Sequence, residues 1–289
     1  MKLSALKNNS SLRKLWYGLS PKNRYRVRAL YFLPLDFWER ITGKTHKYVP
    51  SRGAVFTGGT AGASIFLAQG NQQLELLKEY AGLEPQHQVL DIGCGLGRTA
   101  IALTGFLNDK GSYQGFDVVE KGIAWCNKGI GADYSNFQFT HVSLFNDLYT
   151  ANGEKANSFV FPYPDKNFDR IFNFSVFTHM GIEEIQNYLV QMKRTLKNEG
   201  SCLCTFFIYD DTNEHYIGTR AGFHFPVAHD GYKLMSAETV AGNIAIHENL
   251  LLRMATKAGF ENCKIIDGFW KDSVRDTGKK EYQDIVLLS

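Results

Sequence analysis

The chain has 289 residues, of which 44% are hydrophobic, and a formal net charge of +3; these values are typical of one large globular α/β domain with appended elements. No stretch reaches the roughly 18 uninterrupted apolar residues of a transmembrane helix, and the N-terminus lacks the apolar core of a signal peptide. The five cysteines are scattered and match no zinc-site spacing, so we expect reduced thiols, a cytoplasmic location and no metal.

The first 50 residues carry most of the positive charge. They hold 11 Lys and Arg against two acids, Asp36 and Glu39, which leaves the rest of the chain acidic. Helices are predicted over 3–18 and 21–42, with many aromatic residues among the cations. We interpret residues 1–52 as a basic helical arm that packs on the domain as a lid. Contact with an anionic membrane surface, as a peripheral protein, is the alternative. Nucleic acid is not expected, because the basic residues do not continue into the domain.

The most informative segment follows a glycine-rich loop over 53–62 and a predicted helix over 71–81. In VLDIGCGLGR (89–98), a buried strand over 88–92 leads into three alternate glycines and a helix over 97–107. Glycines lack Cβ atoms, so a ligand can approach the backbone closely. Asp91 lies at the end of the strand, where a carboxylate is badly placed for a pyrophosphate but suits a ligand that brings a cation.

A second acid ends the next strand, which is predicted over 112–117. Asp117 follows Asp91 by 26 positions, about the interval at which ribose-binding acids close the second strand of a nucleotide-binding βαβ unit. A carboxylate for an amino group, an acid for a ribose and a close backbone turn together describe S-adenosylmethionine. The alternative is an ordinary glycine turn in which Asp91 caps a helix.

Strands and helices alternate through the rest of the chain, which indicates a mostly parallel sheet. The predicted elements are a helix over 120–129, strand 137–142, strand 168–174, helix 182–196, strand 201–208, helix 247–258 and strands near 262–269 and 281–288. The stretch 209–245 has no strong period. We expect it to form an insertion over the carboxyl edge of the sheet, where ligands bind.

Four segments, in order, resemble bacterial class I S-adenosylmethionine-dependent methyltransferases. VLDIGCGLGR (89–98) resembles the first motif, and GFDVVEKGIAWC (115–126) the second strand and its helix. FPYPDKNFDRIFNFSVFTHM (161–180) resembles the fourth strand and active-site edge, and YLVQMKRTLKNEGSCLCTFF (188–207) the following helix and fifth strand.

This resemblance covers residues 53–289 and implies a seven-stranded, mostly parallel Rossmann-like sheet with the last strand antiparallel. It also implies a substrate cap at 209–245 and a subgroup that acts on small molecules or glycans, largely of unassigned substrate.

The resemblance implies S-adenosylmethionine as cofactor. It places the binding residues at Asp91, Gly93, Cys94, Gly95, Asp117, Val118, Ser143, Phe174 and Ser175. The family carries an acid soon after the third strand, whereas this chain has Ser143 there. The adenine amine could therefore bond to Ser143, to Asp147 or to a backbone carbonyl.

Methyl transfer from a sulfonium is an in-line displacement, so a protein contributes mainly by positioning the acceptor. A hydroxyl acceptor also needs a base, and His179 is the candidate because it directly follows the fourth strand and titrates near neutrality. A structural histidine is the alternative. The competing histidines are His215, His224, His229 and the pair His247-Glu248. Phe172 and Phe174 are expected in the sheet core, and Phe177 is a candidate for contact with the sulfonium.

We expect O-methylation of a small molecule or sugar, because the Asn/Asp-Pro-Pro-Tyr/Phe motif that serves planar amino groups is replaced by Phe174-Ser175-Val176-Phe177. A non-catalytic binding or scaffold protein on the same fold is one alternative. An NAD-linked oxidoreductase is another, although it favours a Gly-x-Gly-x-x-Gly turn without Asp91. The sequence does not set the oligomeric state.

Overall fold

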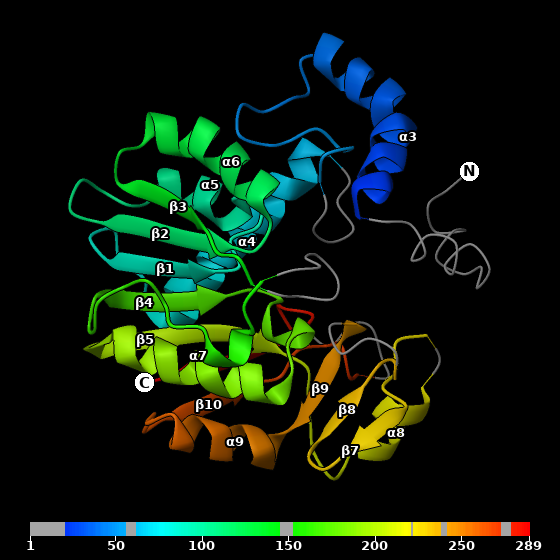
Figure 1. Ribbon diagram of the computed structural model, residues 1–289, viewed down its shortest axis with the longest axis vertical. Helices are drawn as coiled ribbons and strands as arrows, with labels where there is room; N and C mark the ends of the chain where they lie inside the picture. The colour runs from blue at the N-terminus through cyan, green and yellow to red at the C-terminus, as the bar shows by residue number, and fades with distance from the viewer. Residues whose placement is uncertain (1–20, 56–61, 145–152, 221, 238–241, 273–278) are drawn as a thin grey trace.

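The computed structural model describes residues 21–55, 62–144, 153–220, 222–237, 242–272 and 279–289. A central seven-stranded sheet has helices on both faces, and a second, smaller sheet lies beside it (Figure 1). Among these residues, no helix is both long and apolar enough to cross a membrane. The helix predicted over 3–18 lies outside the described residues.

The large sheet has the strand order β10-β11-β5-β4-β1-β2-β3. Parallel ladders join β3, β2, β1, β4 and β5, whereas β11 pairs antiparallel with both β5 and β10. The predicted mostly parallel sheet with an antiparallel last strand is therefore confirmed. Its strands are β1 (Gln88–Ile92), β2 (Ser112–Asp117), β3 (Phe137–His141), β4 (Phe168–Asn173), β5 (Leu196–Phe206), β10 (Cys263–Ile266) and β11 (Asp284–Leu288).

Helices cover the sheet in two layers, each with its own core. One core packs beneath α4 (Ala63–Ala81), α5 (Arg98–Thr104) and α6 (Glu120–Cys126), and the other beneath α7 (Ile182–Thr195) and α9 (Glu248–Lys257) (Figure 1). Val89 faces the first core, whereas Leu90 and Ile92 face the second. Alternate side chains point to opposite faces of a strand, so a strand buried on both faces is apolar almost throughout.

The insertion after β5 forms a sheet of its own. Its strands run in the order β6 (Ile208–Tyr209), β9 (Ile244–His247), β8 (Tyr232–Leu234) and β7 (Val227–His229), and α8 (Glu214–Thr219) precedes β7 in the chain. The carboxylate of Asp284 ties this sheet to the large one, because it accepts hydrogen bonds from the backbone of Ile208 at 2.7 Å and of Gly268 at 2.8 Å. The substrate-cap role of 209–245 stays a prediction.

Two element boundaries differ most from the sequence prediction. Helix α4 begins at Ala63 rather than near Asn71, and it therefore includes Gly70, which the predicted bounds leave out. A Cβ atom on Gly70 would lie 2.4 Å from the carbonyl oxygen of Arg98, so glycine serves there to let α4 and α5 cross closely. Strand β5 begins at Leu196 rather than near Ser201, because its ladder with β4 extends to Phe168.

The N-terminal helix α3 (Pro21–Ile41) agrees with the prediction over 21–42. In Figure 1 it stands apart from the helices that cover the sheet, at the opposite end of the molecule from the small sheet. It is held to the segment 49–55, which leads toward α4.

Candidate cofactor and active site

The turn between β1 and α5 has a backbone that favours glycine. Gly93, Gly95 and Gly97 have φ of +75°, +56° and +76°, in the left-handed region that other residues rarely adopt. At Gly93, a Cβ atom would also come within 2.4 Å of a methyl group of Val176. The turn therefore presses its backbone against the segment that follows β4, as a ligand-binding glycine turn requires.

A cavity of about 330 Å³ opens at the carboxyl ends of β1, β2 and β4, a volume typical of a small-molecule site. Its walls include His179 and every predicted cofactor-binding residue except Ser143. The further lining residues with polar side chains are Gln73, Arg98, Thr99, Glu184, Tyr188 and Gln283.

Asp91 is the most strongly perturbed acid in this cavity. It is 3% exposed, and its carboxylate accepts a hydrogen bond from the Tyr113 hydroxyl at 2.7 Å. Burial raises the pKa of Asp91 from 3.8 to about 7, the Tyr113 hydrogen bond opposes that rise, and the charge of Asp117 adds to it. Among the described residues, the pKa of Asp91 is thus set by burial, a neutral donor and a second acid. A cationic ligand group would compensate this burial.

Asp117 ties the glycine turn to the end of β2. One carboxylate oxygen accepts the backbone N–H of Gly95 at 2.8 Å, and the other accepts that of Val119 at 2.8 Å. Burial raises the pKa of Asp117, and these backbone donors oppose the rise. Each carboxylate oxygen can accept two hydrogen bonds, so both keep capacity for a ligand hydroxyl.

The segment after β4 is strained where it reaches the cavity. Ser175 has φ of +60°, which is uncommon for a residue other than glycine and occurs often at functional sites. Its N–H donates to the Thr205 hydroxyl at 2.7 Å, and its hydroxyl donates to Gln283 at 2.9 Å. The 3₁₀ turn η3 (Phe177–His179) follows and brings His179 to the cavity wall.

Residues 89–200, which contain this glycine turn and both acids, match the family model for a methyltransferase domain. This match is consistent with a class I S-adenosylmethionine-dependent methyltransferase domain. The match begins at Val89, the second residue of β1, and ends within β5 at Gly200. It thus includes the carboxyl ends of β1, β2 and β4, at which the cavity opens.

Solved structures share the fold of this chain. A protein of Pyrococcus horikoshii is 14% identical, with a TM-score of 0.50 over 88% of this chain and 98% of that chain. A candidate O-methyltransferase from Nostoc punctiforme is 13% identical, with a TM-score of 0.50 over 95% of this chain and 70% of that chain. At these identities the likeness shows the fold alone.

Two predicted contacts lie away from this cavity. Ser143 is exposed and is not among the described residues that line the cavity, because Val142 and Leu144 on either side turn inward. Leu144 lines the cavity instead. The expected contact of Phe177 with the sulfonium is wrong, because its ring is fully buried and its centroid lies 5.0 Å from that of Phe206. Phe174 lines the cavity instead. Asp147 lies outside the described residues.

The competing histidines have structural contacts in the small sheet and the start of α9. The ring of His247 accepts the Asn249 backbone N–H at 3.2 Å and lies 3.0 Å from Asp211, so it caps α9. His229 stacks on Tyr232 with ring centroids 4.6 Å apart. The described residues that line the cavity include His179 but none of His215, His224, His229 or His247.

Arg98 is the most important residue that the sequence interpretation missed. Its guanidinium lies over the Phe66 ring at 4.9 Å, burial lowers its pKa, and its Nε has no hydrogen-bond partner within the described ranges. A buried guanidinium on a cavity wall suits a ligand carboxylate. The signal was present in the sequence, since Arg98 follows the last glycine of the turn directly.

Proposed function

We propose that the chain binds S-adenosylmethionine in this cavity and transfers its methyl group to a hydroxyl of a small molecule or sugar. The observation that carries the proposal is the buried carboxylate of Asp91, whose pKa is about 7. Burying a charge is unfavourable unless an opposite charge compensates it. The ammonium of the cofactor's methionine portion supplies that charge. A pyrophosphate would instead meet two acids, Asp91 and Asp117, on the same wall.

The other groups on the wall suit the remaining parts of this cofactor. Asp117 is assigned to the ribose hydroxyls, because both its oxygens keep acceptor capacity after binding Gly95 and Val119. Arg98 is assigned to the methionine carboxylate. Val118 and Leu144 offer apolar surface for the adenine. A backbone carbonyl is assigned to the adenine amine, because Ser143 is exposed and does not line the cavity.

When bound, the cofactor supplies an activated methyl carbon. The protein's part is to hold an acceptor oxygen in line with that carbon and to remove the acceptor's proton. His179 is the proposed base. It stands on the cavity wall beside the strained Ser175 turn, and the fixed backbone of that turn sets its position. There the imidazole would take the hydroxyl proton of the acceptor, while the bound cofactor would supply the methyl group.

Titration calorimetry with S-adenosylhomocysteine and with NADH separates this function from an oxidoreductase. We expect heat of binding with S-adenosylhomocysteine and none with NADH. Binding of NADH alone would overturn the proposal. A screen of hydroxylated acceptors with methyl-labelled S-adenosylmethionine then separates an enzyme from a scaffold protein, which would bind the cofactor without turnover on any acceptor.

A further inference from the structure

Helix α3 is held to the rest of the protein by its polar side. The carboxylate of Asp36 accepts the backbone N–H groups of Arg52 at 2.7 Å and Gly53 at 3.1 Å. Glu39 accepts a hydrogen bond from Arg52 Nε at 3.1 Å. Ala29 lies so close that a Cβ atom on Gly53 would be 2.9 Å from its Cα. These contacts fix which side of α3 faces the protein.

The opposite side of α3 is apolar and faces solvent. Leu30, Leu33, Phe37 and Ile41 recur at helical spacing and form one stripe, and Trp38 lies beside it. Leu30 is 71% exposed and Phe37 is 63% exposed. A helix on a globular protein normally buries its apolar stripe and exposes its polar one. This helix buries Phe32 but leaves its longer apolar stripe exposed, and an exposed stripe of this extent marks an interaction surface.

The exposed surface around this stripe is positively charged. Arg26 and Arg40 on α3, and Lys44 just beyond it, are exposed. The two acids of the helix, Asp36 and Glu39, are turned toward Arg52 and Gly53 and engaged there. Apolar and aromatic side chains flanked by cations are typical of helices that lie in the interface of an anionic bilayer. A second copy of the same cationic helix would repel it.

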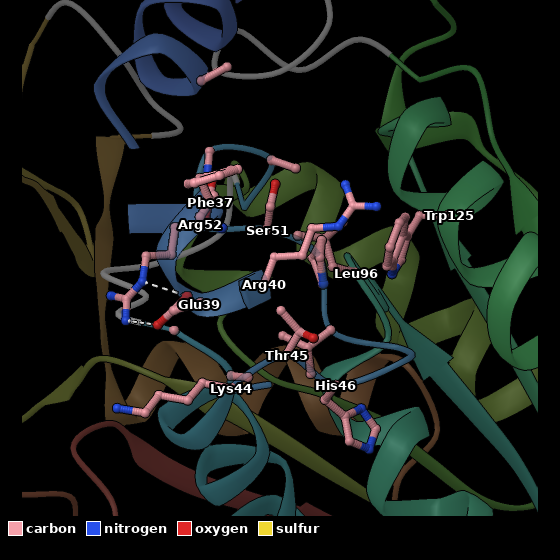
Figure 2. Close-up of a pocket in the computed structure, with 18 of the residues that line it drawn as sticks. Phe37, Glu39, Arg40, Lys44, Thr45, His46, Ser51, Arg52, Leu96 and Trp125 are labelled. Carbon is pink, nitrogen blue, oxygen red and sulfur yellow. Dashed lines mark hydrogen bonds and ion pairs between the residues drawn. The ribbon is translucent and has the colours of Figure 1, made fainter. Parts of the chain in front are cut away.

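A cavity of about 940 Å³ opens along this helix. Figure 2 shows Phe37 and Arg40 of α3 with Trp125 across from them, and Leu96 also lines this cavity. The cavity is thus bordered by the apolar stripe, through Phe37, and by the cation Arg40. Leu96 also lines the cofactor cavity, so the two cavities share a wall.

We propose that α3 docks on an anionic bilayer and that the cavity beside it takes the headgroup of an anionic lipid. The acyl chains would stay with the bilayer against the apolar stripe, while Arg40 and Lys44 meet the phosphate. The shared wall at Leu96 places that headgroup next to the cofactor cavity. Docking stands on the surface of α3 alone, whereas the position of the headgroup beside a bound methyl donor rests on the proposed function.

Co-sedimentation with vesicles tests the docking. We expect the full chain to bind vesicles of phosphatidylcholine with phosphatidylglycerol, to bind pure phosphatidylcholine far less, and to lose binding as salt is raised above about 0.15 M. Leu30→Ser with Phe37→Ser should weaken binding about tenfold or more. The matched control is Val160→Ser with Val190→Ser, because these valines are 63% and 40% exposed elsewhere on the surface. The control should bind like the parent chain.

A second pair of double variants tests whether the cations beside α3 are needed, and both members of the pair lose the same net charge. Arg40→Gln with Lys44→Gln should lose the preference for phosphatidylglycerol, whereas Lys110→Gln with Lys264→Gln, two exposed cations away from α3, should keep it. The proposal is overturned if the parent chain binds both vesicle types equally, or if the two double variants lose the preference for phosphatidylglycerol to the same extent. So does a dimer in light scattering that Leu30→Ser with Phe37→Ser dissociates, because a second copy would then cover the stripe.

Calorimetry with S-adenosylhomocysteine keeps the two proposals apart. All four α3 and control variants should bind it like the parent chain, since none of the substituted residues lines the cofactor cavity. Vesicle binding without S-adenosylhomocysteine binding would refute the proposed function and leave the docking intact.

Discussion

Replacing Asp91 with Asn should stabilise the protein and weaken cofactor binding at the same time. The carboxylate is 3% exposed, and burial raises its pKa from 3.8 to about 7. A difference of one pH unit between folded and unfolded pKa values corresponds to about 1.36 kcal/mol. The folded protein without cofactor therefore bears a cost of about 4 kcal/mol above about pH 7. Asn keeps the side-chain shape and a carbonyl oxygen for Tyr113 without that cost.

The pH dependence of this stabilisation has a definite sign. Because the folded pKa of Asp91 lies above the unfolded one, the folded state binds the proton more tightly, and stability falls as pH rises between the two values. Asn does not ionise. The gain in free energy of unfolding should thus grow from about 1–2 kcal/mol at about pH 5 to about 4 kcal/mol at about pH 8.

Urea unfolding of both proteins at the two pH values measures this gain, with Asp109→Asn as a control at an exposed acid. Calorimetry at about pH 8 should show affinity for S-adenosylhomocysteine lower by about 10²–10³, the loss of a buried charge-assisted contact. Affinity within about twofold of the parent chain would refute the assignment of Asp91 to the ammonium. A loss of stability at the higher pH would refute the electrostatic reasoning.

Three further substitutions test the remaining parts of the site. His179→Ala should slow turnover on a hydroxyl acceptor by about 10²–10⁴ in steady-state assays, whereas a rate within a few-fold would make this histidine structural. Asp117→Ala should weaken S-adenosylhomocysteine binding by about 1.5–3 kcal/mol in calorimetry, and unchanged affinity would contradict the ribose assignment. Gly93→Ala should cost more than about 2 kcal/mol in urea unfolding. This loss of stability should be larger than the loss caused by Gly43→Ala, because φ at Gly43 is also positive, at +67°, but the space for a Cβ atom there is open. Equal losses for the two substitutions would argue against the contact between Gly93 and Val176.

Much of the fold could be predicted because its signals are local. The strand at Gln88–Ile92 and the strand at Ser112–Asp117 have the predicted bounds, since apolar runs there end in glycine or an acid. The cavity brings together Asp91, Asp117 and His179, because the carboxyl ends of neighbouring parallel strands meet at one edge.

What could not be predicted depends on contacts between distant segments. Gly70 is a helix breaker by propensity, and its place within α4 follows from the crossing with Arg98. Phe177 is turned into the core by packing against Phe206, which no local pattern reveals. The direction in which α3 points also has no local signal. Its apolar stripe is visible in the sequence, but its exposure results from the anchoring of Asp36 to the backbone of Arg52.

The arrangement of the two acids around the methyl donor is tested most directly by a crystal structure with S-adenosylhomocysteine. We expect the ligand's ammonium within about 3 Å of the Asp91 carboxylate and both ribose hydroxyls on Asp117. A ligand bound elsewhere, or in this cavity with its ammonium turned away from Asp91, would contradict it.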